Sequence, residues 1–348
     1  MFNANVLDAF WLFITERQNV FYRRKILGLP RPWTGDEVIA NARFTNVYRE
    51  LDRGTQFTVE EIMEKSDDKY LSQIITEVIT YRFFNRIDTY TDIAQLLLYH
   101  DKFVVDNNLH DTDMYTDITN GIAAVLKMRR DSKQKIYTGA YMASYCPKMG
   151  GRDREHDAAL VVQEIARKAP IIAGTMMSPR GTVRGIYDII STIKGFGKFL
   201  SYQCALDFTY PLSTLGGSRI AQYADQSKWS KAGPGAEEGL RILGMEETGD
   251  KHRLEAMREL YLRQFQDISR LGLSMQWLRD KDGNTYSLSL SNIENCLCEF
   301  QKWWRMHNGG HVKTIWSPPQ ETDWQPSSVT LPFYGEWNDR VFGRMIVL

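Results

Sequence analysis

A glycine-containing turn between two helical patterns is the feature of this sequence best suited to bind a phosphate group. The apolar spacing predicts one helix that ends near Ile193 and another that begins near Phe199. Gly195 and Gly197 lie between them, and Lys198 follows directly. Such a turn can aim backbone N–H groups and a helix N-terminus at one phosphate, to which the lysine adds positive charge. The alternative is a plain tight turn without a ligand.

Asp225 is the carboxylate that we predict to act as a catalytic acid or base. It follows the glycine turn in the sequence and precedes the stretch Gly233-Pro234-Gly235. A carboxylate beside a glycine-rich bend can face a pocket and exchange a proton with a substrate. The alternative is a helix cap or a loop acid, which is the commoner place of a single aspartate. Gly233 and Gly235 either line a substrate site or form a simple turn.

Arg43, Arg49 and Arg53 are candidate ligands of a phosphate group. If this segment is helical, Asn46, Arg49 and Arg53 lie at helical spacings and the two arginines share one face. The guanidinium fork binds phosphate at two points. A surface helix with ion pairs between acidic residues and arginines would show the same spacing. Upstream, Trp33 offers either a ring on which a base stacks or a core tryptophan.

Charge is balanced over the whole chain but uneven along it. Lys plus Arg and Asp plus Glu each number 43 in 348 residues, so net charge gives no global attraction to nucleic acid. Between Lys127 and Arg154, basic residues clearly outnumber acidic ones. We expect this segment either to follow a phosphate backbone or to form a solvated loop.

Cysteine and histidine residues do not predict a metal site. Four cysteines are few for this length and indicate a reducing compartment. Cys296 and Cys298, followed by His307 and His311, suggest zinc. However, the two cysteines are too close for the usual zinc spacing and would point to different sides of the helix predicted there.

Targeting and membrane signals are also missing from the sequence. No basic region precedes the first apolar residues, so we expect no secretory signal and a cytoplasmic location. No stretch approaches the roughly 20 apolar residues of a membrane span, so no membrane association is expected.

Helical periodicity dominates the rest of the chain. We expect Thr34 to cap a helix that carries the apolar residues up to Leu51, and Thr58 to open another. Convincing strands are scarce, with a short hairpin possible near 282–290 or 311–316. The pattern predicts a mainly α fold. Further helices are expected at 6–27, 70–88, 90–104, 156–168, 181–193, 252–272 and 290–306.

Taken as a set, these motifs resemble the glycosylase-like family of DNA base hypermodification proteins. That family has been called α-glutamyl/putrescinyl-thymine pyrophosphorylases and later amino acid:DNA transferases, and the same helical module is fused to kinase domains in 5-hydroxymethyluracil DNA kinases. The resemblance covers roughly residues 10–310. It rests on Glu16-Arg17, Pro32-Trp33-Thr34, residues 43–53, Thr138-Gly139-Ala140-Tyr141, Gly195-Phe196-Gly197-Lys198-Phe199, Tyr202-Gln203, Asp225, Gly233-Pro234-Gly235 and Leu297-Cys298-Glu299-Phe300 with Lys302.

The resemblance implies a helix-hairpin-helix fold like that of DNA glycosylases. Residues 1–348 would form a single glycosylase-like unit with two helical lobes, approximately 30–180 and 181–315, and a cleft between them. The N-terminal helix 6–27 would pack on the second lobe. Residues 316–348 would be a C-terminal extension.

The resemblance also implies a role in hypermodification of phage-type DNA, in which 5-hydroxymethyluracil replaces thymine. A kinase first phosphorylates the hydroxymethyl group, and a transferase then replaces the phosphate with an amine. The donor would be glycine, another amino acid or a polyamine, and no cofactor is expected. Because the sequence has no phosphate loop of the nucleotide-kinase type, we expect the transferase, acting after such a kinase in the cytoplasm of an infected bacterial cell.

Site residues follow from the same resemblance. The base would be flipped into a pocket. Gly195, Phe196, Gly197 and Lys198 would hold the DNA backbone, and Arg43, Arg49 and Arg53 the leaving phosphate. Asp225 would deprotonate the amine. A second route uses Cys298 as a thiolate that adds to uracil C6, and Glu299 is the remaining catalytic candidate. Pocket residues would be Glu16, Arg17, Trp33, Asn46, Asp52, Tyr141, Tyr202, Gln203, Gly233, Gly235 and Lys302.

Two other function classes stay open at this point. A true DNA glycosylase would excise a modified base and leave abasic sites, because a fold does not determine its reaction. A non-catalytic module that binds modified DNA would leave the DNA unchanged whatever amine is supplied.

Overall fold

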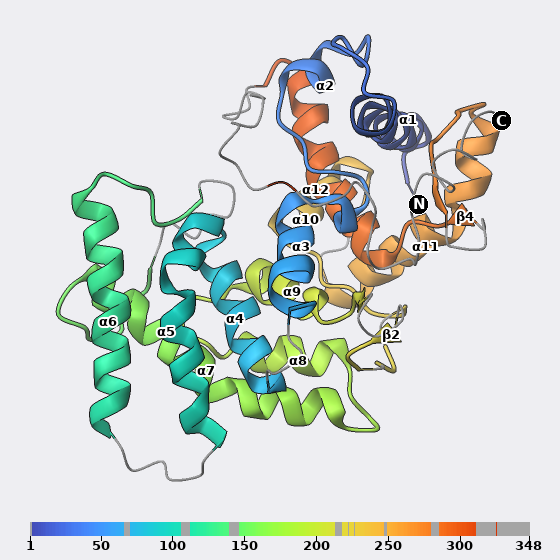
Figure 1. The fold of residues 1–348 in the computed structure, drawn as a ribbon. Helices are drawn as coiled ribbons and strands as arrows, with labels where there is room; N and C mark the ends of the chain where they lie inside the picture. The colour runs from blue at the N-terminus through green and yellow to red at the C-terminus, as the bar shows by residue number, and fades with distance from the viewer. Residues whose placement is uncertain are drawn as a thin grey trace. The chain divides into compact units, whose positions relative to one another are not determined.

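The computed structural model is mainly helical, as the sequence predicts (Figure 1). Two short antiparallel ladders are the exceptions among the described residues: β1 (Pro211–Leu212) pairs with β2 (Ser218–Arg219), and β3 (Leu278–Arg279) with β4 (Thr285–Tyr286). None of the described helices is both long and apolar enough to span a membrane. The structure describes residues 2–65, 70–105, 112–138, 146–212, 218–221, 223–225, 227–246, 249–279, 285–310 and 325.

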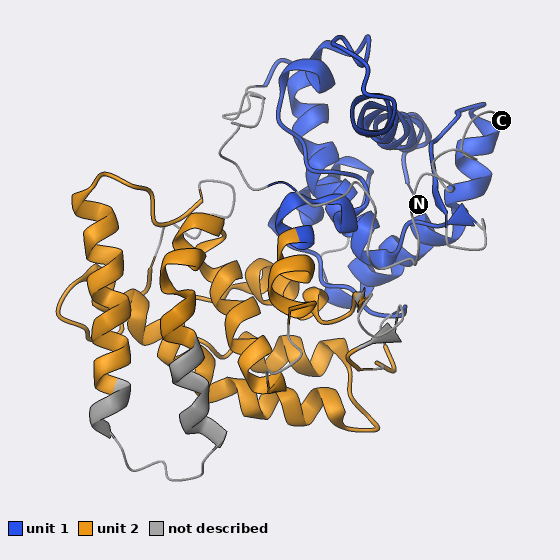
Figure 2. Cartoon of the chain, viewed as in Figure 1, with its two compact units in different colours: residues 1–56, 227–348 blue, residues 57–226 orange. Residues whose placement is uncertain are grey.

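The chain divides into two compact units (Figure 2). Unit 1 consists of residues 1–56 and 227–348, and unit 2 of residues 57–226. These boundaries differ from the expected lobes 30–180 and 181–315, because residues 30–56 group with the C-terminal part of the chain and 181–226 with the middle. The short helix α3 (Arg53–Phe57) and the π-helical turn η3 (Thr58–Met63) follow each other at the first boundary.

Unit 1 is built around the long helix α12, which packs against α1, α2, α10 and α11. Its core is aromatic: the ring of Phe300 lies 5.3 Å from that of Phe10, and the ring of Trp303 lies 5.6 Å from that of Phe13. The helical elements of unit 1 are α1 (Ala4–Phe21), its π-helical continuation η1 (Tyr22–Ile26), α2 (Glu37–Asn41), the 3-10 turn η2 (Arg49–Leu51), α10 (Pro234–Ile242), α11 (Asp250–Arg270) and α12 (Leu290–His307).

Two glycines allow α10 to approach α12 closely. A Cβ at Gly235 would overlap Cys298 Sγ, and one at Gly239 would overlap the backbone carbonyl oxygen of Leu297. The stretch Gly233-Pro234-Gly235 therefore begins a helix that packs on α12, with Gly233 as its N-cap and proline in its first turn.

Unit 2 surrounds α4, whose side chains from Ser72 to Phe84 are all buried. Helix α4 contacts α5, α7 and α9. A buried ion pair joins α4 to α9, because the Nε and Nη2 atoms of Arg82 donate to the two carboxylate oxygens of Asp207 at 2.6 and 2.7 Å. The helices of this unit after η3 are α4 (Leu71–Phe84), α5 (Ile87–Val105), α6 (Thr112–Asp131), α7 (Arg154–Met177), α8 (Val183–Ile190) and α9 (Lys198–Asp207).

The expected helix from Thr34 to Leu51 is wrong. Helix α2 ends at Asn41, and the chain from 43 to 48 is neither helix nor strand. The N-cap of α2 is Asp36, which accepts a hydrogen bond from the Ile39 N–H at 2.9 Å, whereas Thr34 accepts one from the Asp36 N–H. The cause is tertiary: side chains of α12 supply hydrogen-bond partners to this stretch, so it needs no helical ones.

Thr58 does not open a helix either. It lies inside the π-helical turn Thr58–Met63 that continues directly from α3, and its side chain is buried. Its residue type favours a cap, but the preceding residues already continue the helical path.

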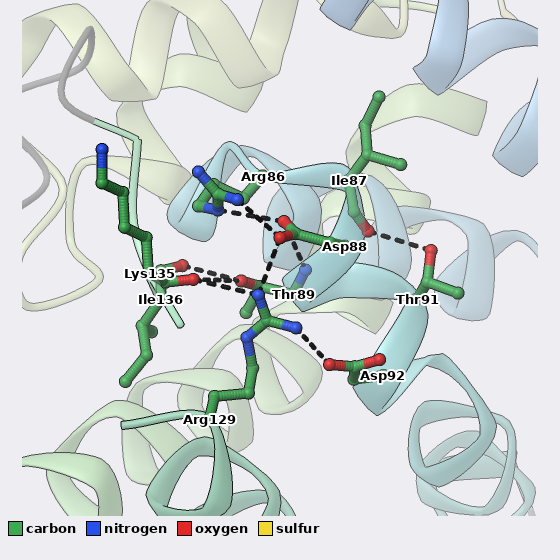
Figure 3. Close-up of polar contacts among 9 residues, drawn as sticks. All are labelled: Arg86, Ile87, Asp88, Thr89, Thr91, Asp92, Arg129, Lys135 and Ile136. Carbon is green, nitrogen blue, oxygen red and sulfur yellow. Dashed lines mark hydrogen bonds and ion pairs between the residues drawn. The ribbon is translucent and has the colours of Figure 1, made fainter. Parts of the chain in front are cut away.

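The basic segment between Lys127 and Arg154 is only partly available to a phosphate backbone. Arg129 is buried, and its guanidinium lies against Asp92, 2.8 Å from Asp88 and 3.0 Å from the carbonyl oxygen of Lys135 (Figure 3). In the same cluster Arg86 pairs with Asp88 (Figure 3). We call this group the Arg129 network. It joins the start of α5 to the end of α6.

Candidate functional site

Unit 1 contains a dense group of buried and half-buried polar side chains where α12 meets α1 and the irregular segment 43–52. Helix α1 contributes one arginine, the irregular segment contributes two residues, and α12 contributes the rest. We call this group the α12 polar cluster and define it as Arg17, Asn46, Asp52, Asn292, Glu294, Asn295, Glu299 and Lys302.

Helix α12 holds the irregular segment through its side chains. The backbone N–H of Thr45 donates to Glu299 Oε2 at 3.1 Å, and the N–H of Arg49 donates to Asn292 Oδ1 at 3.0 Å. These bonds replace the partners that a helix would provide. The polar face of α12 therefore determines the path of the chain that carries the arginines.

Asn46 lies at the centre of this group. Arg17 Nη2 donates to its Oδ1 at 2.9 Å, and Asn295 Nδ2 donates to its backbone oxygen at 2.8 Å. Its own N–H donates to Asp52 Oδ1 at 3.0 Å, and its side-chain amide to the Leu51 oxygen at 2.7 Å. Asn46 therefore links Arg17 to Asp52, and the role of these three residues in a substrate pocket stays a prediction.

Burial shifts the protonation of the cluster toward neutral forms. It raises the pKa of Glu294 to about 7, although the Gly233 N–H donates to Glu294 Oε1 at 3.0 Å and Arg49 acts in the opposite direction. It raises the pKa of Asp52 to about 6 against the attraction of Arg49, and lowers that of Arg17 to about 10. Two carboxyl groups that titrate near neutral pH can exchange protons with a substrate.

Glu299 and Lys302 form an ion pair one helical turn apart. Lys302 Nζ lies 2.5 Å from Glu299 Oε2 and 5.5 Å from the centre of the Phe44 ring. The same carboxylate oxygen accepts the Thr45 N–H. Glu299 therefore anchors the irregular segment, which is a positioning role in the structure as it stands.

Cys298 is not prepared for thiolate chemistry. Burial, with Glu299 and Glu294 nearby, raises the pKa of the Cys298 thiol to about 12. The thiolate is the attacking species in such reactions, and this thiol is protonated at neutral pH. The close packing against Gly235 instead gives Cys298 a structural contact with α10.

The three candidate phosphate arginines do not share a face. Arg49 is only 4% exposed, whereas Arg43 and Arg53 are exposed. The face predicted to be shared by Arg49 and Arg53 required a continuous helix, but the 3-10 turn η2 ends at Leu51 and α3 begins at Arg53. Only the exposed pair can meet a phosphate without rearrangement of the fold.

Trp33 is half-buried and supports arginines. The guanidinium carbons of Arg24 and Arg31 lie 5.2 and 5.5 Å from its ring centre, and its Nε1 donates to the Leu29 oxygen at 2.7 Å. Glu16 pairs with Arg23 at 2.9 Å. These two expected pocket residues therefore contact the cations that follow α1.

The glycine turn of unit 2 has the predicted helix–turn–helix course. Gly195 adopts φ +95°, and a Cβ there would lie 2.9 Å from Pro147 Cδ, so a side chain would be strained on both counts. Phe196 is buried and stacks on Phe83. Gly197 is the exposed N-cap of α9 without a side-chain cap, and the exposed Lys198 follows it.

Asp225 belongs to unit 2, where it caps a helix. Its Oδ1 accepts the N–H of Val183 at 2.7 Å and its Oδ2 that of Arg184 at 3.1 Å, both in the first turn of α8. The structure therefore contains the contacts of the capping alternative. A role as a base stays a prediction.

Tyr202 and Gln203 are both buried on α9. Neither the oxygen nor the nitrogen of the Gln203 amide has a hydrogen-bond partner, which is unusual for a side chain with no exposed surface. Tyr141 lies outside the described residues. So does His311, and no three histidine, cysteine or acidic residues gather as metal ligands in the part of the chain that the structure describes.

Sequence reasoning missed Asn292, Glu294 and Asn295. The signal that could have found Asn292 and Asn295 is a row of polar residues at helical spacing, and Glu294 lies outside that row. Positions 292, 295, 299 and 302 recur at intervals of three and four residues, and therefore lie along one side of α12.

Comparisons with known proteins connect this chain to phage DNA modification. Residues 4–312 match the family model described as "5-hmdU DNA kinase, helical domain". The chain is also 26% identical over 307 residues to the "5-hmdU DNA kinase" of Bacillus phage SP10, a match that covers 86% of this chain and 45% of that protein. The chain thus spans about half the length of this curated relative. No solved structure has significant similarity to it.

Proposed function

Because the chain belongs to the family of 5-hmdU DNA kinase helical domains, we propose that it takes part in thymidine hypermodification by transferring an amine to DNA. The acceptor would be 5-phosphomethyl-deoxyuridine, and the product an aminomethyl derivative. The observation that carries this proposal is Glu294, a buried carboxyl group whose pKa is raised to about 7. An amine must lose a proton before it attacks, and a base with this pKa accepts one at neutral pH.

The proposed reaction is a substitution at the exocyclic methylene carbon of the base. A carboxylate removes a proton from the donor ammonium, and the nitrogen lone pair forms the new C–N bond. The C–O bond to phosphate breaks, and phosphate leaves with that electron pair. The alkylated nitrogen then releases its second proton. No oxidant, reductant or cofactor is required, and the donor would be an amino acid such as glycine or a polyamine.

Glu294 and Asp225 are the two candidate bases. Both oxygens of Asp225 already accept backbone N–H groups of α8, which occupies the lone pairs that face them. Glu294 has one such bond, from Gly233. We therefore place Glu294 first and Asp225 second. Glu299 would act by positioning, and Cys298 has no place in this route because its thiol stays protonated.

DNA contacts would come from the exposed cations and from the glycine turn. The N-terminus of α9, which begins after Gly197, would hold one backbone phosphate together with the exposed Lys198. Exposed Arg43 and Arg53 suit further phosphates, including the one that leaves.

The target base must leave the duplex to reach buried groups. The unpartnered amide of Gln203 presents a donor beside an acceptor. That pair complements the N3–H and a carbonyl oxygen of uracil.

A second candidate function is favoured by the description of the family. The matched model is named as one domain of a kinase, and the phage relative is about twice as long as the match. The helical domain would then hold modified DNA for a separate catalytic domain, and would leave the nucleoside unchanged.

Nucleoside mass spectrometry distinguishes these functions. DNA that contains 5-phosphomethyluracil is incubated with the protein and a pool of isotope-labelled amino acids and polyamines, then digested. An amine adduct supports the transferase and identifies its donor. Unchanged nucleoside with retained DNA binding supports the binding domain, and abasic sites would indicate a glycosylase.

The base is assigned with isosteric variants. We expect Glu294→Gln to slow transfer at least about 100-fold while DNA binding is kept. Glu255→Gln, an exposed acid of α11, is the matched control and should transfer normally. Full activity of Glu294→Gln together with loss in Asp225→Asn would move the base to unit 2.

A further inference from the structure

A group of cations follows α1 and differs in composition from the α12 polar cluster. Residues 22–33 contain four basic side chains and no acidic one. Arg23 pairs with Glu16. The other three are Arg24 and Lys25 in η1 and Arg31 in the following loop, of which Lys25 and Arg31 are exposed. We call Arg24, Lys25, Arg31 and Trp33 the Trp33 platform.

Hydrogen bonds hold the indole of the platform in place. The Trp33 Nε1 atom donates to the Leu29 oxygen at 2.7 Å, and the Trp33 backbone oxygen accepts from Arg23 Nη1 at 2.6 Å. The guanidinium carbons of Arg24 and Arg31 then lie 5.2 and 5.5 Å from the ring centre. Ring contacts of this kind orient long side chains that would otherwise be mobile.

The charges of the platform repel one another. Partial burial and the neighbouring Arg31 lower the pKa of Arg24, and partial burial and Arg24 lower that of Lys25. Like charges are therefore held close together on the surface of unit 1. An anion placed against them would relieve this repulsion, and two phosphates of one strand would relieve it more than one.

We propose that the Trp33 platform is a contact surface for the phosphate backbone of DNA, outside the reaction site. The proposal rests on the proposed DNA substrate. Phosphate suits the platform because arginine binds it at two points and keeps its other face on an aromatic ring. Trp33 would thus support the cations and would not stack on a flipped base, since guanidinium groups already lie over its ring.

The salt dependence of DNA binding tests the platform. Affinity for an unmodified duplex of about 20 base pairs is measured between 50 and 200 mM salt. Each phosphate neutralised by a cation contributes about 0.9 to the slope of log affinity against log salt. We expect Arg24→Gln/Lys25→Gln to reduce the slope by about 2 and to weaken binding at least about 10-fold at 100 mM salt.

Two matched variants separate charge from structure. Arg241→Gln/Lys251→Gln removes the same charge from exposed positions of α10 and α11 in the same unit, and should keep the slope. Arg24→Lys/Lys25→Arg keeps the charge and should also keep the slope of log affinity against log salt. A normal melting temperature shows that the tested variant is folded. An unchanged slope in the folded Arg24→Gln/Lys25→Gln variant overturns the proposal.

The same measurement separates this proposal from the proposed function. Binding to an unmodified duplex requires no amine transfer. If the protein binds DNA through the platform but transfers no amine, the platform proposal stands and only the transferase proposal fails. Loss of slope in the platform variant with normal amine transfer supports the platform as a contact outside the reaction site. If the platform variant binds DNA normally but no longer binds an acidic protein, the platform is a surface for a protein partner and the proposal is overturned.

Discussion

The α12 polar cluster of unit 1 and the Arg129 network of unit 2 are both groups of charged residues between helices, but their electrostatics are opposite. In the Arg129 network, one buried arginine faces Asp88 and Asp92, whose carboxylates are about half exposed. In the α12 polar cluster, Glu294 is 2% exposed and burial dominates its protonation. Ion pairs therefore determine the protonation of Asp88 in the first group, whereas burial determines that of Glu294 in the second, although Glu299 and Lys302 form an ion pair there.

This difference separates a structural role from a chemical one. Partial burial acts to raise the pKa of Asp88, but hydrogen bonds from Arg86 and Arg129 outweigh it and lower the pKa. Such a carboxylate stays charged and joins two helices. A carboxyl group with a raised pKa lowers the stability of the fold when it ionises. Such groups are found most often at sites that exchange protons with a substrate. The contrast therefore favours unit 1 for the proton transfer that we propose.

Removal of Arg82 would break the best-matched pair of unit 2 and is expected to have the largest effect. In Arg82→Met, the carboxylate of Asp207 stays buried without its guanidinium, which costs about 3–5 kcal/mol in the free energy of unfolding. Urea denaturation measures this. Arg82→Met/Asp207→Leu should recover most of the loss, because no uncompensated charge remains. A loss below about 1 kcal/mol in the single variant would contradict complementary pairing.

The pH dependence of stability tests Glu294. Its pKa is 4.5 in the ordinary state and about 7 in the fold, so the stability that it contributes is fully present below about pH 4.5 and is lost as the pH rises through 7. We expect Glu294→Gln to remove a decline of about 3 kcal/mol between these values. Chemical denaturation at several pH values measures it. If the free energy of unfolding changes with pH in the same way in the original protein and in Glu294→Gln, the pKa of Glu294 is not raised.

The approach of α10 to α12 is tested by one methyl group. In Gly239→Ala the new Cβ would overlap a backbone oxygen that cannot rotate away, and we expect a loss of roughly 1–3 kcal/mol. Gly174→Ala in α7 is the control, since a Cβ there meets no atom within 4 Å and should stabilise the helix by up to about 1 kcal/mol. Thermal melts compare them. If Gly239→Ala and Gly174→Ala change the melting temperature equally, α10 and α12 can move apart at little cost.

The smallest effect is expected at Asp88, with the opposite pH direction to Glu294. Because its pKa is lowered, its contribution is present above its ordinary pKa of 3.8 and is lost as the pH falls below it. The carboxylate is half exposed, so we expect Asp88→Asn to cost less than about 1 kcal/mol at pH 7. Denaturation at pH 7 and pH 3 measures the difference. A larger loss at pH 3 than at pH 7 would reverse the assignment.

Several features could be predicted from the sequence because they depend on neighbours along the chain. Apolar spacing is enough to predict most helices of the structure, including α11 and α12. The turn between α8 and α9 also follows from local chemistry, since Gly195 needs a positive φ that other residues avoid. The grouping of Arg17, Asn46 and Asp52 came instead from family resemblance.

The segment 43–52 could not be predicted in the same way. Its partners on α12 lie about 250 positions away in the sequence, as in the bond from Thr45 to Glu299. Local periodicity contains no information about such a partner, so the segment was predicted as a helix. The same long-range contacts determine that Arg49 is buried while Arg43 and Arg53 are exposed.

The sequence by itself determined a mainly helical protein with a glycine turn, a balanced charge and polar residues of the types that handle phosphate and protons. Only the tertiary structure decided which of these polar groups are buried together. The side chain of Asp225 accepts hydrogen bonds from the first turn of α8, and burial raises the pKa of the Glu294 carboxyl group to about 7. The physical reason is that a pKa and a hydrogen bond depend on neighbours in space, which helical periodicity does not specify.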